Sequence, residues 1–274
     1  MSSWSRRRPS DGPSVPHEAA SLSLAEALGV AGDDVVALVG GGGKTTVMFR
    51  LAREIVEQGG CALSTTTTHI SAAQIALAPA HLVAADATRE HIAEALARHR
   101  HVLVVGNMND GDGRAAGVSL DLVSRLRAWY PGACLLNEAD GSRMRPFKAP
   151  AEHEPVIPAE TTLVVPVVGA DVLGRPLDPE HVHRPELVSA LSGAPLGTSI
   201  TPAIVARVLA HPDGGRKGVP ASARTVVLIN KVEALADLAP ARETAERLLA
   251  EPAIHAVLLT TVRRDKPVLD VFAR

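Results

Sequence analysis

Short apolar runs alternate along the chain with segments in which apolar residues recur every three or four positions. The run at 35–39, VVALV, is apolar throughout, which is typical of a strand buried on both faces of a parallel sheet. After it, Val47, Leu51 and Ile55 are spaced by four and predict the buried face of a helix. Further strands are predicted at 61–64, 81–84, 101–105, 133–137, 162–168, 225–229 and 256–260. Because helical segments separate several of these strands, the sequence predicts an α/β fold with a mostly parallel sheet flanked by helices.

This alternation is interrupted between residues 169 and 223, where Pro and Gly are frequent and one helix, at 202–210, is predicted. A segment of this length between two strands is typical of an insertion. We therefore expect a single domain over residues 21–274 with a lid-like insertion at about 169–223. Residues 1–20 are rich in Ser, Pro and Arg, which predicts a disordered tail.

Composition and charge exclude several classes of protein. The 274 residues include 28 Lys and Arg against 30 Asp and Glu, so the net charge is −2 and there is no basic excess to neutralise a nucleic-acid backbone. Aromatic residues make up 2% of the chain, too few for the stacking surfaces of single-strand binders. No apolar stretch approaches the roughly 18 residues of a membrane span, and the N-terminal arginines are not followed by the apolar region of a signal peptide. We expect a cytoplasmic protein with neither nucleic acid nor membrane as a partner, and Cys61 and Cys134 as buried, reduced thiols.

A glycine-rich run lies between the first strand and its helix, which is the context of a phosphate-binding loop. Glycines let backbone N–H groups turn toward phosphate oxygens, and the helix N-terminus adds a partial positive charge. Lys44 is placed to reach the β- and γ-phosphates, and the Thr45 hydroxyl to bind Mg²⁺. Leu38 occupies the first glycine position of the full Walker A pattern, so the loop has the shorter G-x-x-G-K-T form, similar to that of Mur-type ligases. The candidate phosphate-binding residues are Gly40, Gly41, Gly42, Gly43, Lys44, Thr45 and Thr46.

Two acids follow the strand at 133–137. Because side chains alternate along a strand, Glu138 and Asp140 are expected to face the same way. A phosphate-binding loop needs a carboxylate on a neighbouring strand to hold Mg²⁺, so either acid could bind the metal or orient an attacking water. An ordinary turn is the alternative, since Asp140-Gly141 is a common turn dipeptide. The candidate catalytic residues are Lys44, Glu138 and Asp140.

Further polar residues are candidates for binding phosphate or an anionic substrate. Thr66 and Thr67 lie at the carboxyl end of the second strand, where ligands bind in open α/β sheets. Arg143, Arg145 and Lys148 place three cations just after the two acids. The alternatives are β-favouring residues that end a strand and a solvated basic loop.

Two histidines, His181 and His183, invite a metal-site interpretation. Side chains this close in sequence rarely converge on one ion without partners from elsewhere in the chain. We expect both histidines to lie in an exposed loop.

The tetrapeptide Asn230-Lys231-Val232-Glu233 follows the strand predicted at 225–229. Its position and chemistry match the Asn-Lys-x-Asp element of GTPases, whose acid accepts both guanine N–H protons and whose lysine packs over the base. The carboxylate of Glu233 is one methylene further from the backbone, so we expect a modest preference for GTP over ATP. The alternative is a strand that runs into a helix start with an acid in its first turn. Asn230, Lys231 and Glu233 are therefore candidate base-binding residues.

Six motifs occur in a fixed order between about residues 22 and 249: VVALVGGGGKTTVMFRLARE, TTTT, NEADGSRMRPFKAPAEHEPVIP, VVGADVLGRPL, VHRPE and VLINKVE. Together they resemble the YqeC family, P-loop proteins named as accessory or biosynthesis proteins for selenium-dependent molybdenum hydroxylases. Glu233 stands where such proteins usually have Asp, and Asn137 where the strand usually ends in an apolar residue. The resemblance implies a P-loop NTPase-like fold and a partner among molybdenum hydroxylases or their cofactor-maturation proteins.

Three functions fit these residues. The leading hypothesis is a Mg²⁺-dependent GTPase or ATPase that serves the maturation of a selenium-dependent molybdenum hydroxylase. The Mur-like loop and the cations at Arg143, Arg145 and Lys148 favour, as the alternative, an ATP-dependent ligase or kinase that acts on an anionic small molecule. The third is a nucleotide-binding scaffold without turnover.

Overall fold

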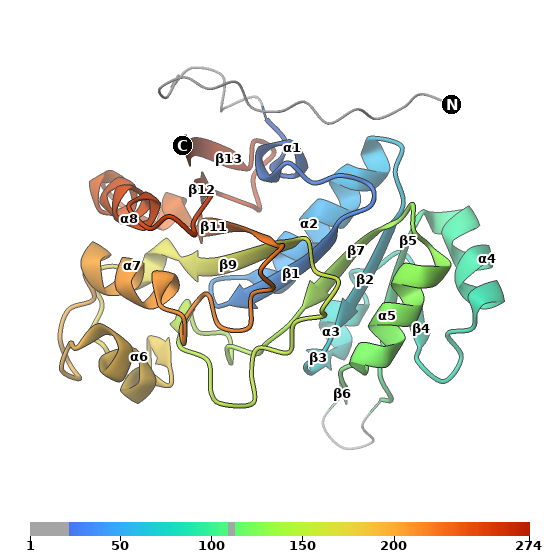
Figure 1. Cartoon of the computed structure of the whole chain (residues 1–274), viewed down its shortest axis with the longest axis horizontal. Helices are drawn as coiled ribbons and strands as arrows, with labels where there is room; N and C mark the ends of the chain where they lie inside the picture. The colour runs from blue at the N-terminus through green and yellow to red at the C-terminus, as the bar shows by residue number, and fades with distance from the viewer. Residues whose placement is uncertain (1–21, 109–112) are drawn as a thin grey trace.

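The computed structural model describes residues 22–108 and 113–274, so the tail expected at residues 1–20 lies outside the described residues (Figure 1). A nine-stranded sheet has the order β13-β12-β11-β9-β1-β7-β2-β5-β4. All neighbouring pairs are parallel except β12 and β13, which confirms the predicted α/β fold with a mostly parallel sheet. The strands are β1 (Val35–Gly40), β2 (Ala62–Thr66), β4 (His81–Val83), β5 (His101–Val105), β7 (Cys134–Glu138), β9 (Leu163–Gly169), β11 (Arg224–Asn230), β12 (Ala256–Thr260) and β13 (Val268–Ala273).

Helices flank the sheet on both faces (Figure 1). Alternate residues of the central strands point to opposite faces, and because these residues are apolar, both faces need helices to cover them. Val36 and Leu38 of β1 pack in one cluster with α1 and α2, whereas Val35 packs in another with α4 and α5. The cluster with α7 and α8 includes Val227 of β11. The helices are α1 (Leu24–Leu28), α2 (Lys44–Glu57), α3 (Ala72–Ile75), α4 (Arg89–His99), α5 (Leu120–Trp129), α6 (Pro185–Ser192), α7 (Pro202–Ala210) and α8 (Ala239–Leu249).

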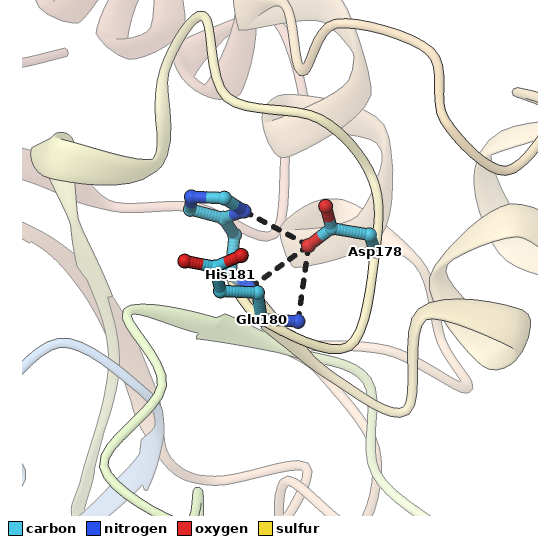
Figure 2. Close-up of side chains that lie close together, drawn as sticks. All are labelled: Asp178, Glu180 and His181. Carbon is cyan, nitrogen blue, oxygen red and sulfur yellow. Dashed lines mark hydrogen bonds and ion pairs between the residues drawn. The ribbon is translucent and has the colours of Figure 1, made fainter.

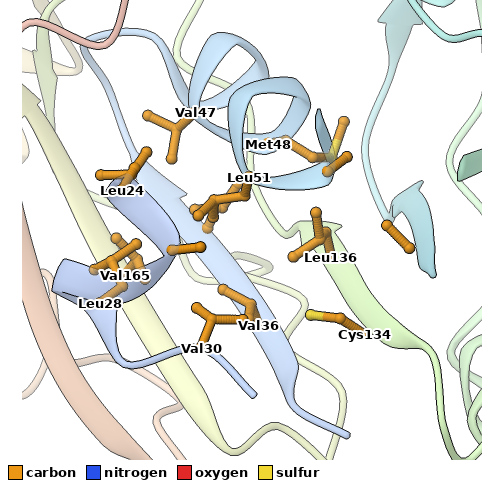
Figure 3. Packing of buried hydrophobic residues seen from close by; sticks show 14 of the residues in the cluster. Leu24, Leu28, Val30, Val36, Val47, Met48, Leu51, Cys134, Leu136 and Val165 are labelled. Atoms are coloured by element: carbon orange, nitrogen blue, oxygen red, sulfur yellow. The ribbon is translucent and has the colours of Figure 1, made fainter. Parts of the chain in front are cut away.

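The core beneath α2 holds the glycine-rich loop in place. Val47 and Leu51 of α2 are fully buried, and they share a cluster with Val36 of β1 and Leu136 of β7 (Figure 3). The helical face predicted from the spacing of four is thus the buried face. Removal of one such large apolar side chain costs about 2–5 kcal/mol of stability, so the end of β1 and the start of α2 are firmly positioned.

The segment at 169–223 continues the core beside β11 and β12. Val188 of α6 and Val205 and Val208 of α7 are buried in one cluster with Val227 of β11 and Leu248 of α8. The predicted helix at 202–210 is confirmed as α7, while α6 and a short helical turn, η2 (Ala170–Val172), were not predicted. The lid-like role of this segment stays a prediction.

Two small sheets lie outside the main one. β8 (Phe147–Lys148) pairs with β10 (Val182–His183) in parallel, and β3 (Ile70–Ser71) pairs with β6 (Arg114–Ala115) antiparallel. The first of these joins the loop after β7 to the segment at 169–223.

Two expectations from composition also have a structural counterpart. Cys134 is fully buried and free, as expected, whereas Cys61 is half-buried, because it lies before β2 rather than within it. Among the described residues, no helix is both long enough and apolar enough to cross a membrane.

Candidate functional site

The glycine-rich loop joins the central strand β1 to α2, with Gly40 as the last residue of the strand and Lys44 as the first of the helix. Gly42 and Gly43 have φ angles of 74° and 109°, which only glycine adopts without strain. A Cβ at Gly42 would lie 2.2 Å from the nitrogen of Gly169, so the loop packs directly against the end of β9. The predicted strand–loop–helix context of a phosphate-binding loop is therefore present.

Three backbone N–H groups of this loop bind acceptors within the protein. The N–H of Gly40 donates to the Asp140 carboxylate at 3.0 Å, that of Gly41 to the Val167 carbonyl at 2.8 Å, and that of Gly42 to the Arg145 carbonyl at 3.3 Å. The first N–H groups of a helix have no intrahelical acceptor. An anion bound here is thus expected to meet the N–H groups of residues 43–46, at the positive end of α2.

Lys44 is buried between two carboxylates. Its Nζ donates to the Gly40 carbonyl at 2.6 Å and lies 3.3 Å from Asp140 Oδ1 and 3.6 Å from Glu138 Oε1. Burial alone would lower the pKa of Lys44, but attraction to Asp140 and Glu138 outweighs it, so the pKa lies above its usual range. The ammonium is therefore held in its charged form at the start of α2.

Thr45 and Glu138 bring a hydroxyl and a carboxylate together beside Lys44. The Thr45 hydroxyl donates to Glu138 Oε2 at 2.7 Å and accepts a hydrogen bond from Gln74 Nε2 at 2.9 Å. Burial raises the pKa of Glu138, and the Lys44 charge and the hydrogen bond from Thr45 offset only part of this. Hydroxyl and carboxylate oxygens are hard ligands of the type that Mg²⁺ prefers, so this donor set fits the metal. Sequence reasoning missed Gln74, whose capping box with Ser71 is visible locally but whose contact with Thr45 is not.

Asp140 and Glu138 both reach Lys44, as expected from their spacing, but their surroundings differ. The Asp140 carboxylate accepts from the Gly40 N–H and pairs with Lys44 and, at 3.1 Å, with Lys148 Nζ. Asp140 therefore stabilises the loop and orients Lys44. The geometry favours Glu138 as the metal ligand of the two.

Asn230, the last residue of β11, connects the glycine-rich loop to the end of β12. Its Nδ2 donates to the Gly42 carbonyl at 2.8 Å, and its Oδ1 accepts from the Val262 N–H at 3.2 Å and the Thr260 hydroxyl at 3.3 Å. The side chain is almost fully buried. The start of the Asn-Lys-x-Glu segment therefore lies directly beside the glycine-rich loop.

The other two base-binding candidates of that segment are more open to solvent. Lys231 Nζ pairs with Asp171 Oδ2 at 2.8 Å, and Glu233 is exposed in the short helical turn η3 (Val232–Ala234). Asp171 was not among the predicted residues, because its pairing joins two segments far apart in sequence. Its other oxygen, Oδ1, is buried and has no hydrogen-bond partner among the described residues.

The secondary candidates make contacts with the backbone. The Thr66 hydroxyl donates to the Glu138 carbonyl at 3.1 Å, and the Thr67 hydroxyl donates to the Val156 carbonyl at 2.9 Å. Arg145 Nε donates to the Pro179 carbonyl at 3.0 Å. These three side chains thus help to position the loops around the site.

Lys148 is as deeply buried as Lys44. Its Nζ lies 3.1 Å from Asp140 Oδ2, donates to the Gly141 carbonyl at 2.7 Å and pairs with Glu154. Glu154 Oε1 in turn accepts from Arg184 Nη2 at 2.8 Å. An alternating series of charges therefore runs from the glycine-rich loop to the start of α6, and sequence reasoning missed its last two members.

The two histidines of the segment at 169–223 are both half-buried rather than exposed. His183 belongs to β10 and lies opposite Lys148 of β8, so the expected exposed loop is wrong there. Asp178 Oδ1 accepts from the backbone N–H groups of Glu180 and His181 at 3.0 Å and pairs with His181 Nδ1 at 2.8 Å (Figure 2). These contacts form a turn that satisfies its own polar groups, and they carry no metal assignment.

The fold and the site define an α/β protein in which a glycine-rich loop after the central strand meets a buried lysine, a threonine and two carboxylates. The family described as YqeC protein matches residues 36–186. The uncharacterized protein YqeC of Escherichia coli K12 is 31% identical over 203 residues, which cover 72% of this chain and 75% of that relative. The chain belongs to the YqeC family, as its motifs suggested.

Proposed function

We propose that this protein binds a nucleoside triphosphate with Mg²⁺ at the loop between β1 and α2 and hydrolyses it. The observation that carries the proposal is the Thr45 hydroxyl at 2.7 Å from Glu138, beside a charged Lys44 at the N-terminus of α2. These are the side chains that a phosphate-binding loop uses for the metal and for the terminal phosphates.

Different residues of the site would bind the phosphates and the metal. Lys44 supplies a compact positive charge for the β- and γ-phosphates, and residues 43–46 supply N–H donors. Thr45 and Glu138 would hold Mg²⁺, which supplies charge neutralisation of the phosphate oxygens when bound. Asp140 keeps Lys44 charged and ties it to the loop, through contacts on Lys44 Nζ and the Gly40 N–H.

The base is expected at the end of β11. Asn230 ties that end to Gly42, so a base held by Lys231 and Glu233 would lie within reach of phosphates held at residues 43–46. Glu233 is exposed and makes no hydrogen bond or ion pair within the described chain, so its carboxylate can accept hydrogen bonds from a guanine. Because its side chain is one methylene longer than that of Asp, we expect GTP to be preferred over ATP only modestly.

Membership of the YqeC family supports an accessory role. We propose that this role lies in the maturation of a selenium-dependent molybdenum hydroxylase, with such an enzyme or its cofactor-maturation proteins as partners. Lys148, which pairs with Asp140, and Arg184, which pairs with Glu154, favour a second candidate, an ATP-dependent ligase or kinase acting on an anionic small molecule.

Calorimetry with GTP and ATP, with and without Mg²⁺, tests the proposal. Lys44→Ala should reduce triphosphate affinity at least about 100-fold, because no other side chain of the loop reaches the terminal phosphates. Arg53→Ala is the matched control, since Arg53 lies on the exposed face of the same helix and pairs with Glu57 at 3.6 Å. Unchanged affinity in folded Lys44→Ala would refute the site.

Phosphate release separates the candidate activities. Release by the protein alone supports the hydrolase, and release that requires an added anionic acceptor supports the ligase or kinase. Binding without release identifies a scaffold.

A further inference from the structure

Positive charge gathers on the side of Asp140 that faces away from Lys44. The pairing of β8 with β10 sets Lys148 opposite His183, and Arg184 follows directly. Arg143 lies five positions before Lys148, in the loop that leads from β7 into β8. Within this group Glu154 is the acid that pairs with both Lys148 and Arg184.

Arg184 is held in an unusual position. It has a φ angle of 62° and precedes α6 as its N-cap residue, without a side-chain hydrogen bond to the helix start. Its Nη2 binds Glu154, but its Nη1 is buried and has no hydrogen-bond partner within the described chain. A buried guanidinium N–H without an acceptor is unfavourable, so the position is one that an added acceptor would stabilise. The positive end of α6 favours a negatively charged acceptor.

The turn at 142–145 is a second segment with a strained backbone. Arg143 and Met144 have φ angles of 48° and 63°, and the Arg145 N–H donates to the Ser142 carbonyl at 2.9 Å. This is the geometry of a type I′ turn, which normally contains Gly, Asn or Asp at both positions. Strain of this kind persists where the surrounding structure requires it, and it is concentrated at binding sites. Here it leaves the Arg143 side chain exposed.

The surroundings of His183 agree with an excess of positive charge. Burial, followed by the positive charges of Arg184 and Lys148, lowers the pKa of His183 to about 4; Glu154 opposes this shift and Arg143 adds to it. Positive charge therefore outweighs negative charge around His183, and this balance favours a bound anion over a further cation.

We propose that Arg143 and Arg184 bind an anionic small molecule, through a phosphate or a carboxylate group, in a second site beside the phosphate-binding loop. Lys148 adds a buried positive charge, and it links the two sites because its partner Asp140 also pairs with Lys44. This inference deepens the second candidate function, on which it rests for the anionic small molecule, but the site itself does not depend on whether a nucleotide is hydrolysed. It assigns a place to the second substrate of a transfer reaction or to an anionic effector of a hydrolase.

Titration of the nucleotide-free protein with inorganic phosphate and, separately, with citrate at low salt tests the site. Arg184→Gln should weaken the affinity for the anion at least about 10-fold, because it removes a charged hydrogen-bond donor. Arg143→Gln should weaken it about two- to fivefold, and it removes an exposed side chain that cannot cause unfolding through a lost core contact. Arg125→Gln, an exposed arginine on α5 that pairs with Asp121, should change nothing. A preference for one of the two anions identifies the phosphate or the carboxylate as the recognised group.

The Lys44→Ala variant distinguishes this site from the phosphate-binding loop. Anion binding that persists in Lys44→Ala and is lost in Arg184→Gln supports the second site, even if no nucleotide binds. Binding that is lost in Lys44→Ala and kept in both arginine variants overturns it. Absence of binding of both anions to the parent protein overturns it as well.

Discussion

Two buried lysines lie on opposite sides of one carboxylate. Lys44 is 3.3 Å from Asp140 Oδ1 and Lys148 is 3.1 Å from Asp140 Oδ2, and each residue is 3% exposed. Each lysine also has a second acid, Glu138 for Lys44 and Glu154 for Lys148. The two halves of this arrangement are alike in charge and burial, and they differ in what else contacts the second acid.

Glu138 and Glu154 have opposite pKa shifts. Burial raises the pKa of Glu138, whose neighbours are Lys44 and a neutral hydroxyl. Burial would also raise the pKa of Glu154, but hydrogen bonds from Arg184 and Lys148 outweigh it and lower the pKa. A carboxylate with two cations is fixed in place, whereas one with a single cation and a hydroxyl has capacity for a further positive charge. The comparison teaches that the carboxylate of Glu138 is suited to a metal, whereas the carboxylate of Glu154 is held in place by its two cations.

The largest expected effect is on stability. Lys148→Met should lower the free energy of unfolding by about 3 kcal/mol, because it leaves Asp140 and Glu154 buried with less compensation. Lys44→Met should cost less, since Glu138 can take up a proton instead. Denaturant unfolding at neutral pH measures both variants. Equal losses would show that the two lysines are equivalent and would end the comparison.

Metal dependence should separate the two acids beside Lys44. Glu138→Gln should reduce the Mg²⁺-dependent part of nucleotide affinity about 10- to 100-fold, because the amide is a weaker metal ligand than a carboxylate. Asp140→Asn should leave the Mg²⁺ titration close to that of the parent and lower the melting temperature instead. If both variants titrate with Mg²⁺ like the parent, neither acid holds the metal.

The stability of the protein should fall in acid because of the cations around His183. The pKa of His183 is lowered from 6.5 to about 4 in the folded protein, so between these pH values the unfolded state binds the proton more readily. Its contribution to stability is present above about pH 6.5 and is lost as the pH falls toward 4. His183→Asn should reduce the fall in melting temperature over this range, and Arg184→Gln should raise the pKa of His183 in an NMR titration. A pKa of His183 near 6.5 in the parent would contradict this description of its surroundings.

The smallest effect is expected at the base. Glu233→Asp shortens the carboxylate by one methylene and should increase the preference for GTP over ATP a few-fold. Calorimetry with both nucleotides measures the ratio in the parent and the variant. Equal affinities for GTP and ATP in both proteins would show that the segment after β11 does not read the base, and would favour the ligase.

Much of the fold could be predicted from the sequence because local patterns carry it. Continuous apolar runs mark strands that are buried on both faces, and the spacing of Val47, Leu51 and Ile55 marks the buried side of α2. β13 was not predicted, because an edge strand with partly exposed residues lacks such a run. α6 was not predicted either, since its eight residues lie in a segment rich in Pro and Gly.

The sequence by itself determined the glycine-rich loop, its lysine and threonine, and the two acids at the end of β7, since these depend on short motifs at the ends of predicted strands. Only the tertiary structure decided that Glu138 binds the Thr45 hydroxyl while Asp140 holds the loop, and that Gln74, Glu154 and Arg184 join them. These contacts connect residues from different strands and loops, and the strand order that brings them together is set by the packing of the whole sheet. A local pattern fixes which element forms, whereas the partners of a buried charge depend on everything that is folded around it.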